Sequence, residues 1–476
     1  MLTFLALFWF VQLTDKLGSA PIQFSDRATE NRLLWSIPTD SLDVAVSPNY
    51  IDAVRATGAR VCHVSRWMNG LTIEADSATM LAVKSLPCVA SVELTRDDTP
   101  PSSLVAVEKK LSADTSDPYQ DNAKQLDVYN LRPLHQLGYE GQGIRMAVID
   151  GGFCNVDTAA CLSYVRDRII GTYSFSTDTS SFYSKEGGHG ANCLTFIAAK
   201  TATYHGAAIE AEYVLIRSEE MRTESPKEMD NLVAALELCD SLGVNVISCS
   251  LGYRLFDNPA FNFPHEQVDG KTHRASRAAA IAAKKGILCC FSAGNDGNKD
   301  WHYIGIPADA KDILTIGAVR KDSTMASFSS FGPSADGRVK PEVSAVGSEA
   351  VYVSTQSGLA SKGNGTSYST PLVAGLAAAL WSAMPNAPAQ EIRERIIRSA
   401  HLYPSSDPNN QMGYGIPDAW KAYVNEPTGM INHNDNDNHN GASGHSGKSV
   451  DKIMSPNGRI MIRKANKIYS ILGVEI

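Results

Sequence analysis

Three side chains in this sequence have the types needed for acyl transfer. Ser367 lies on a glycine-rich turn directly before a long apolar run, Asp150 ends a shorter apolar run, and His189 is flanked by Gly188 and Gly190. A serine hydroxyl is a weak nucleophile at neutral pH, so its attack on a carbonyl carbon needs an imidazole to take the proton. It also needs a carboxylate to orient that imidazole. The three residues therefore predict nucleophilic hydrolysis.

The elements around these residues favour the same chemistry. A helix that begins at or near Ser367 would direct its free backbone N–H groups and the positive end of its dipole at a developing oxyanion. The alternative is a simple N-cap on a buried helix, which a lone Gly-Thr-Ser would favour. The order Asp150, His189, Ser367 also distinguishes this set from other triad folds, in which the same residues follow other orders.

Five motifs, found in order along the chain, make it resemble the subtilases, the family of subtilisin-like serine proteases. The resemblance implies that Ser367 is the nucleophile, His189 the general base and later acid, and Asp150 the residue that orients His189. Asn295 then matches the side-chain donor of the oxyanion hole. The motifs are Ala147-Val148-Ile149-Asp150-Gly151-Gly152, Gly188-His189-Gly190, Ser250-Leu251-Gly252, Ser292-Ala293-Gly294-Asn295 and Gly365-Thr366-Ser367-Tyr368-Ser369-Thr370-Pro371.

The resemblance also implies a substrate site. The segments Ser250-Leu251-Gly252 and Ser292-Ala293-Gly294 would form two walls of the pocket for the residue before the cleaved bond. Extended substrate would add as a strand alongside the first wall. Gly305 aligns with the pocket floor, and its lack of a side chain leaves room, which predicts a large apolar or aromatic substrate side chain. The alternative is that Gly305 only permits a turn.

The apolar periodicity predicts an α/β fold with a subtilisin-like, mostly parallel sheet and helices on both faces. Ligands bind beyond the carboxyl ends of strands in such sheets, and Asp150, Ser250 and Asn295 each follow a predicted strand. The predicted strands are Met146–Ile149, Tyr213–Ile216, Val244–Ser248, Ile287–Phe291 and Ile313–Ile316, and the clearest helices are Met229–Leu242 and Arg274–Lys285.

The first residues of the sequence predict targeting. The stretch Met1–Leu13 is apolar and is followed by Gly18-Ser19-Ala20, which suits a signal-peptidase cut. We therefore expect a signal peptide over residues 1–20, with an N-terminal membrane anchor as the alternative.

Residues 21–115 predict a small α+β, ferredoxin-like unit before the catalytic domain. This unit resembles the inhibitory, chaperone-like propeptide of many subtilases, with residues 97–118 as the exposed linker in which maturation occurs. A permanent accessory domain is the alternative. The expected elements are an opening strand near Leu42–Val46, helices Tyr50–Ala56 and Ala78–Ser85, and strands Val61–Ser65, Leu71–Ala75 and Val89–Leu94.

The C-terminal part changes composition after the expected catalytic domain, residues 116–427. Residues 428–449 are polar and of low complexity, which predicts a flexible linker. A calcium loop is the alternative, although Gly441 is misplaced for an EF-hand. Residues 450–476 predict a short β-hairpin-like tail, which resembles C-terminal sorting sequences of secreted Bacteroidetes proteins.

Cysteine use and charge narrow the classes of cofactor and partner. Nine cysteines show no zinc-like spacing. Cys154 with Cys161, and Cys62 with Cys88, are close enough in sequence to be candidate disulfides. We expect no cofactor and recognise no calcium site. The net charge of −8 gives no indication of nucleic-acid binding.

Together these features predict an exported serine endopeptidase, made as an autoprocessed zymogen, that acts on polypeptides and is inhibited by its own propeptide. It would be secreted, periplasmic or on the surface of a Gram-negative, Bacteroidetes-like cell, with no stable membrane span after signal removal. An inert binding or scaffold protein on the same fold is the main alternative. An α/β-hydrolase esterase would need Gly-x-Ser-x-Gly, and the sequence around Ser367 lacks the second glycine.

Overall fold

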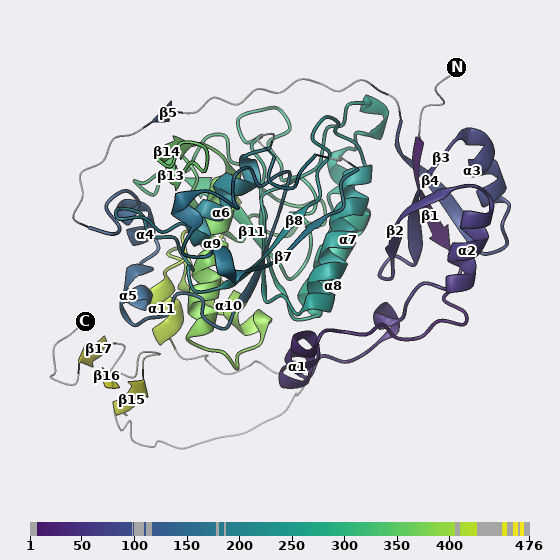
Figure 1. Cartoon of the computed structure of the whole chain (residues 1–476). Helices are drawn as coiled ribbons and strands as arrows, with labels where there is room; N and C mark the ends of the chain where they lie inside the picture. Colours follow the sequence, from purple (N-terminus) through teal and green to yellow (C-terminus); the bar gives the residue numbers. More distant parts are fainter. Residues whose placement is uncertain are drawn as a thin grey trace, which may run out of the picture.

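A computed structural model describes most of the chain, and Figure 1 shows a large α/β unit with a small N-terminal sheet domain beside it. The expected linker over residues 428–449 lies outside the described residues. Side chains are described except in residues 109–110 and beyond residue 450. The described residues are 7–97, 99, 109–110, 117–177, 180–184, 187–404, 410–425, 450–454, 460–464 and 467–470.

The large unit is built on a seven-stranded sheet with the order β12-β11-β10-β9-β6-β8-β7. Every neighbouring pair is parallel, as the sequence predicted. All five expected strands are present, and β7 and β12 add one strand at each edge. The strands are β6 (Arg145–Asp150), β7 (Ile169–Ser174), β8 (Glu212–Arg217), β9 (Val246–Cys249), β10 (Leu288–Ser292), β11 (Leu314–Val319) and β12 (Val343–Val346).

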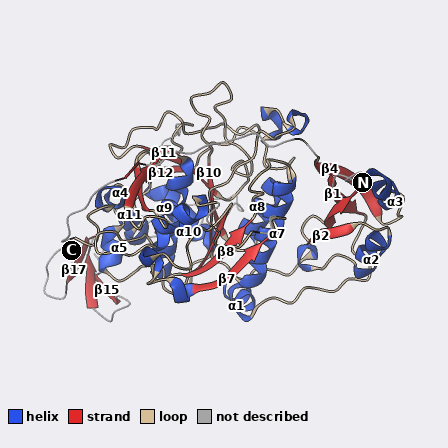
Figure 2. Cartoon of the chain, turned by 45° about the horizontal axis from the view of Figure 1, so that its top comes forward, coloured by secondary structure: helices blue, strands red, loops and turns tan. Residues whose placement is uncertain are grey.

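Helices cover both faces of this sheet because its strands are apolar on both sides. On β6, Met146 and Val148 join the core under α6 and α9, whereas Ala147 and Ile149 join the core under α7 and α8. This alternation follows the period of two along a strand. Figure 2 shows the strands running between the two sets of helices. Their bounds are α6 (His189–Ala198), α9 (Thr366–Ser382) and α10 (Ala389–Ser399) on one face, and α7 (Lys227–Leu242) and α8 (Arg274–Lys284) on the other.

The small domain is a four-stranded antiparallel sheet with the order β2-β3-β1-β4, an α+β unit as predicted. Helices α2 and α3 pack on one face through a separate apolar core that includes Val54 and Met80. The other face lies toward α7, where Phe10, Trp67 and Met68 join the core of the large unit. The elements are β1 (Leu7–Leu13), α1 (Asp26–Leu34), α2 (Pro48–Ala56), β2 (Arg60–Ser65), β3 (Gly70–Ala75), α3 (Ser77–Lys84) and β4 (Val89–Arg96).

The opening strand of this domain was predicted in the wrong place. Around Leu42–Val46 the chain forms only a 3-10 turn and one isolated bridge, between Pro21 and Val44. The opening strand is instead β1, which pairs with both β3 and β4 at the centre of the sheet. Cleavage after Ala20 would remove this central strand, and the signal peptide over residues 1–20 stays a prediction. An apolar stretch suits a targeting segment and a buried strand equally well.

The remaining elements close the ends of the large unit and add a tail. Residues 109–110 form the short strand β5, which pairs with β14. In the tail, β16 and β17 pair around residues 465–466, and β15 adds a third strand. The bounds are α4 (Ala123–Asp127), α5 (Arg132–Gln136), β13 (Ala350–Val353), β14 (Ala360–Gly363), α11 (Ala419–Val424), β15 (Val450–Met454), β16 (Ile460–Lys464) and β17 (Lys467–Ser470).

The cysteines and the helices bear on the expected disulfides and membrane anchor. All nine cysteines are free thiols, so the candidate disulfides Cys154–Cys161 and Cys62–Cys88 are not formed. Among the described residues, no helix combines the length and apolarity that crossing a bilayer requires.

Candidate active site

The strand order places the candidate site where the sheet changes direction of winding. Strand β6 lies between β8 and β9, so the connections leave it toward opposite edges of the sheet. In parallel sheets this point opens a crevice at the carboxyl ends of the strands. Asp150 is the last residue of β6, and Ser250 directly follows β9.

Asp150 and His189 form the central hydrogen bond of the site. His189 Nδ1 lies 2.9 Å from Asp150 Oδ1 and 3.0 Å from Oδ2. Because an ionised carboxylate only accepts, Nδ1 carries the proton, so in the neutral ring Nε2 holds the lone pair. The backbone N–H of Gly151 donates to Asp150 Oδ1 over 2.7 Å, which fixes the carboxylate further. Asp150 is 1% exposed, whereas the His189 side chain is 43% exposed, so the imidazole can meet a substrate.

The glycine after His189 allows helix α6 to approach β6 closely. A Cβ at Gly190 would lie 2.6 Å from Asp150 Cβ and 2.7 Å from the Gly152 carbonyl oxygen. Both distances are shorter than real Cβ contacts. Any larger residue at position 190 would therefore push His189 away from its carboxylate.

Ser367 is the second residue of α9, beside the end of β9. Its hydroxyl donates to the Ser250 carbonyl oxygen over 3.3 Å. In return, the Ser250 hydroxyl donates to the Ser367 carbonyl oxygen over 2.8 Å. Gly365, with φ of 152°, makes the sharp entry into the helix. The turn thus holds the serine at the carboxyl edge of the sheet, with the N-terminus of α9 beneath it.

Asn295 is fixed beside the same turn through its side-chain oxygen. Asn295 Oδ1 accepts from the Thr366 backbone N–H over 2.9 Å and from the Thr366 hydroxyl over 3.1 Å. The Thr366 hydroxyl oxygen also accepts from the Gly294 N–H over 3.1 Å. Because Oδ1 is held in this way, the Nδ2 amide is the donor end left for a ligand. A Cβ built on Gly365 would lie 3.7 Å from Nδ2, so that donor borders the serine turn.

The predicted substrate residues also come together. Ser292 Oγ donates to the Leu251 carbonyl oxygen over 3.3 Å, which joins the two predicted walls. The Gly305 N–H donates to the Ala293 carbonyl oxygen over 3.3 Å. A Cβ at Gly305 would lie 3.3 Å from the Tyr253 carbonyl oxygen, so a side chain there would be crowded. Ser250 and Gly252 flank Leu251 on the first segment, and Gly294 follows Ala293 on the second.

Electrostatics around the imidazole favour its charged form. Burial alone would lower the pKa of His189, but the Asp150 carboxylate outweighs that effect and raises this pKa well above its usual value. Nearby, burial and the Glu224 carboxylate raise the pKa of Glu219 to about 8. Glu219 accepts a hydrogen bond from the Tyr253 hydroxyl over 2.7 Å.

Four residues at the site were not assigned a role from the sequence. Thr366 anchors Asn295, and Cys193 donates from Sγ to the Ser367 carbonyl oxygen over 3.4 Å. The Tyr368 ring stacks on the His189 ring with centroids 6.2 Å apart. Glu219 lies behind Gly151. The i, i+4 spacing of His189 and Cys193 on one helix was the available signal for Cys193, whereas the role of Glu219 depends on a loop.

Some side chains of the catalytic unit are also potential metal ligands. Among the described residues, three groups bring potential ligand atoms within 4.8 Å of one another. One is the candidate catalytic pair itself with Cys193, and a second is a set of carboxylates beside Glu219. The third lies away from the active site. The groups are Asp150, His189 and Cys193; Glu219, Glu224 and Glu228; and His135, Glu140 and His205.

Comparisons with known proteins agree with this geometry. A sequence model described as the Subtilase family matches residues 141–415, which include every candidate site residue. A second model, described as the Peptidase S8 propeptide domain of Bacteroidota, matches residues 9–110. That match begins within β1, ahead of the predicted propeptide start at residue 21.

Three curated relatives illustrate the similarity. Serine protease AprX of Bacillus subtilis (strain 168) is 27% identical over 301 residues, covering 56% of this chain and 64% of AprX. Subtilisin DY of Bacillus licheniformis is 28% identical over 265 residues, covering 55% of this chain and 85% of its own length. Subtilisin E of Bacillus subtilis (strain 168) is 25% identical over 350 residues, covering 73% and 80%. The chain thus spans less than two thirds of AprX.

Proposed function

The chain belongs to the subtilase family of serine endopeptidases, and we propose that it hydrolyses peptide bonds in polypeptides with Ser367 as nucleophile. The observation that carries this proposal is the contact of His189 Nδ1 with both carboxylate oxygens of Asp150. It leaves the Nε2 lone pair of a partly exposed imidazole available at the carboxyl edge of the sheet, where Ser367 also lies.

In the proposed reaction, His189 Nε2 takes the proton of the Ser367 hydroxyl as its oxygen attacks the scissile carbonyl carbon. The Asp150 carboxylate stabilises the imidazolium that forms. The Ser367 backbone N–H and Asn295 Nδ2 donate to the oxyanion. His189 then protonates the leaving amine, and an acyl-enzyme remains. Water attacks that ester by the same steps in reverse order, which releases the acid and restores the serine.

Substrate would bind as an extended strand along Ser250–Gly252, with the residue before the cleaved bond between that segment and Ser292–Gly294. The hydrogen bonds that join the two segments and Gly305 support this assignment. We retain the proposal that Gly305 leaves room for a large apolar or aromatic substrate side chain. A peptide panel cleaved only after small or charged residues would contradict it.

We also propose that residues 7–97 act as an inhibitory prosegment. The end of β2 and the loop after it contact Glu237 of α7. Ser65 Oγ donates to Oε1 over 2.5 Å, and the Arg66 guanidinium lies 3.2 Å from Oε2. Arg66 also lies 2.6 Å from Asp240. The charged side chains are no more than 8% exposed. Buried pairs of this kind hold two surfaces in one register.

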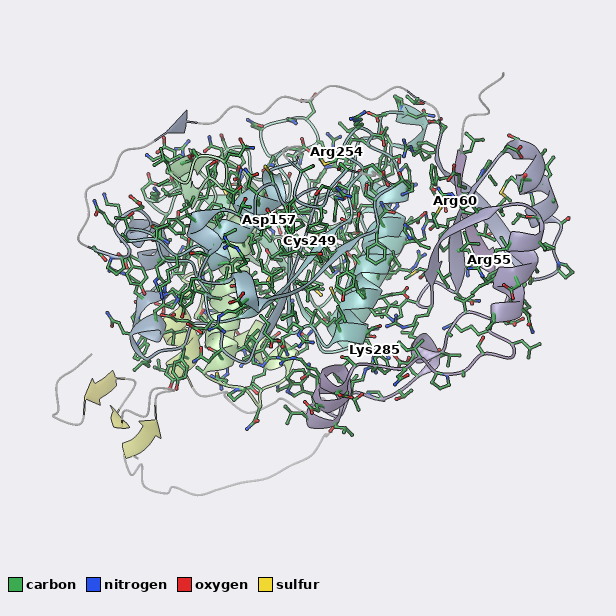
Figure 3. All side chains as sticks on the ribbon, in the orientation of Figure 1. Arg55, Arg60, Asp157, Cys249, Arg254 and Lys285 are labelled. Atoms are coloured by element: carbon green, nitrogen blue, oxygen red, sulfur yellow. The ribbon has the colours of Figure 1, made fainter. Side chains whose placement is uncertain are left out.

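The prosegment makes a second set of contacts with the catalytic unit, away from the active site. The segment between β1 and α2 brings Arg32 to 2.9 Å from Asp240. It also brings Asp43 to 2.9 Å from Lys285, which Figure 3 labels beside α1. Trp35 packs on Trp381 with ring centroids 5.3 Å apart. The prosegment therefore contacts the catalytic unit at two places. These contacts support a role for the prosegment in folding of the catalytic unit as well as in its inhibition.

The path of the linker supports autoprocessing. Asp97 accepts a hydrogen bond from Asn258 over 2.5 Å, so the prosegment leaves its domain across the catalytic unit. Residues 109–110 then pair with Ser361 and Lys362 of β14, the strand that leads into the Ser367 turn. Residues 109–110 thus lie against the strand that precedes the Ser367 turn, and we propose that Ser367 cleaves within residues 97–118.

One experiment separates a protease from an inert scaffold. The full chain, Ser367→Ala and the exposed-site control Ser357→Ala are incubated with an unfolded protein substrate and followed by intact mass. We expect the parent and Ser357→Ala to shed the prosegment and digest the substrate, and Ser367→Ala to do neither. If the parent stays intact and inert even after an added protease trims the linker, the scaffold alternative is the better description.

For localisation, we propose export, with residues 450–476 as a sorting sequence. The support is the Bacteroidota type of the propeptide and the separate three-stranded tail. Fractionation of cells that express the chain with and without residues 450–476 tests this: retention of the truncated chain at the same site as the full chain would exclude a sorting role.

A further inference from the structure

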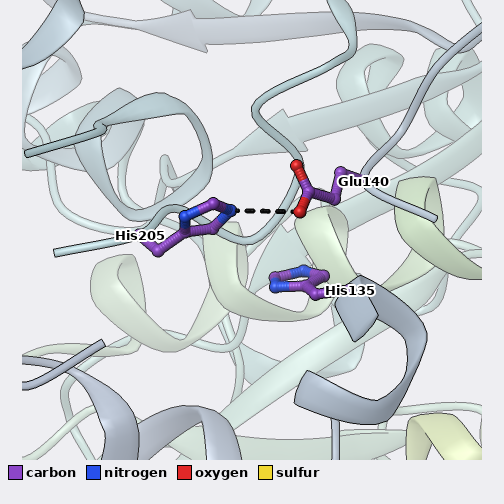
Figure 4. A group of neighbouring side chains, drawn as sticks. All are labelled: His135, Glu140 and His205. Atoms are coloured by element: carbon purple, nitrogen blue, oxygen red, sulfur yellow. Dashed lines mark ion pairs between the residues drawn. The ribbon is translucent and has the colours of Figure 1, made fainter. Parts of the chain in front are cut away.

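Two histidines and a glutamate form a buried cluster that the proposed catalysis does not use. His135 lies on α5, Glu140 on the following loop, and His205 on the loop after α6. His135 is 6% and His205 8% exposed. Figure 4 shows both imidazole rings gathered at the Glu140 carboxylate. One potential ligand atom from each residue lies within 4.8 Å of the others.

The nitrogen of His205 that faces this cluster is buried beside the Glu140 carboxylate. His205 Nε2 is buried, yet no described residue or backbone group forms a hydrogen bond with it. It lies 3.3 Å from Glu140 Oε1. A buried ion-pair contact without regular hydrogen-bond geometry leaves the nitrogen poorly satisfied, so an ion bound between His205 and Glu140 is the explanation to test. Two ligands at about 2.0–2.1 Å from a tetrahedral zinc ion lie roughly 3.3–3.4 Å apart, which matches this spacing.

The second histidine is already held in the tautomer that a metal requires. His135 Nε2 lies 3.0 Å from the Ala207 carbonyl oxygen, which can only accept, so Nε2 carries the proton. Nδ1 then has the lone pair, and it lies 3.1 Å from the Tyr119 hydroxyl. A ligating histidine commonly donates its other N–H to a backbone carbonyl in this way.

The backbone around the cluster is also fixed. The buried Asn122 side chain donates to the His205 carbonyl oxygen over 2.7 Å. The Tyr119 ring covers the site, with its centroid 4.8 Å from that of His205. Tyr119 belongs to the first described residues after the maturation linker. An ion here would therefore tie the beginning of the catalytic unit to α5 and to the loop after α6.

We propose that His135 Nδ1, Glu140 and His205 Nε2 bind a divalent ion of the zinc type, with the Tyr119 hydroxyl or a water molecule in the fourth position. Two imidazoles and one carboxylate are a ligand set that zinc prefers over calcium or magnesium. The site is buried and distant in sequence from the nucleophile, so the ion stabilises the catalytic unit and takes no part in peptide hydrolysis.

The test uses the full chain carrying Ser367→Ala, which prevents self-digestion. The protein is stripped with a chelator, given a small excess of Zn²⁺ and desalted, and its zinc content and Tm are measured. We expect one zinc per chain and a rise in Tm on the order of 5 °C. His205→Gln and Glu140→Gln should each lose the bound zinc and the Tm rise. His265→Gln, which removes a partly exposed histidine elsewhere, should keep both.

Two further measurements make the outcome decisive. Co²⁺ in place of Zn²⁺ should give the visible bands of a tetrahedral nitrogen and oxygen site without a thiolate charge-transfer band. If zinc binding is instead lost in Cys193→Ser and kept in His205→Gln, the ion belongs to the catalytic residues and the proposal is wrong. Absence of any retained zinc in the parent also overturns it. If one cluster variant fails to fold, the other variant and the Co²⁺ spectrum still decide.

Discussion

His189 Nδ1 lies 2.9 Å from Asp150 Oδ1, and the carboxylate is 1% exposed while the imidazole is partly exposed. The buried partner therefore fixes both the tautomer and the direction of the ring, and the other nitrogen faces the substrate side.

Asp150→Asn should leave the fold intact and remove most of the turnover. The amide can donate to Nδ1 and so favour the tautomer in which Nε2 carries the proton and cannot accept one from Ser367. We expect kcat to fall about 10⁴-fold, with a smaller change in KM. Steady-state kinetics on a peptide substrate measure this, and an unchanged Tm shows that the loss is chemical. A loss below tenfold would contradict the proposed role.

Activity should rise with increasing pH as the His189 imidazolium loses its proton, and the pKa of this step should be raised. His189 acts as a base only when neutral, and the Asp150 carboxylate raises its pKa well above the usual value. The acid limb of kcat/KM against pH should therefore lie above about pH 6.5, the ordinary pKa of histidine. A limb at or below that pH would show that burial outweighs the carboxylate. In Asp150→Asn the limb should move to lower pH, because the neutral amide no longer stabilises the imidazolium.

Asn295→Ala should slow catalysis with little effect on binding. The Nδ2 donor meets charge that develops only in the transition state, so its loss should reduce kcat about 10²–10³-fold. Thr366→Ser retains the hydroxyl that holds Asn295 Oδ1 and serves as the control, with near-normal kcat expected. An equal rise in KM at constant kcat would assign Asn295 to ground-state binding instead.

Arg66→Ala should loosen the prosegment. The change leaves Glu237 buried without its cation, whereas Asp240 keeps Arg32, and breaking a buried pair in this way costs about 3–5 kcal/mol. In the Ser367→Ala background we expect faster removal of residues 7–97 by an added protease and a lower first transition in thermal unfolding. Arg55→Ala is the matched control, because the Arg55 side chain is 58% exposed; Figure 3 labels it on the outer helix of the same domain. Equal behaviour of the two variants would remove Arg66 from the docking surface.

The position of β1 can be tested by one substitution. Val11 is fully buried at the centre of the prosegment sheet, so Val11→Asp should cost several kcal/mol and prevent folding of this domain. Refolding yield of the purified chain measures the effect, with the exposed Thr14→Asp as the control. If a chain that begins at residue 21 refolds and matures as well as the parent, β1 is dispensable and the signal-peptide prediction is supported.

Much of the catalytic unit follows from short-range patterns. The alternation of Met146 and Val148 with Ala147 and Ile149 predicts a strand buried on both faces, and its end at Asp150 places a carboxylate at the edge of a parallel sheet. The motifs around His189 and Ser367 likewise determine helix starts within a few residues. These features are local, because side-chain period and backbone turns depend on neighbours in sequence.

Contacts between distant segments were decided only by the tertiary structure. Sequence placed the opening strand of the prosegment near residue 42, because an apolar stretch at the start of a chain does not reveal whether it pairs with β3 and β4. Nothing local links Arg66 to Glu237, or His135 to His205. Such contacts depend on how the sheets and helices pack, so they arise from the summed free energy of the whole fold and not from any local pattern.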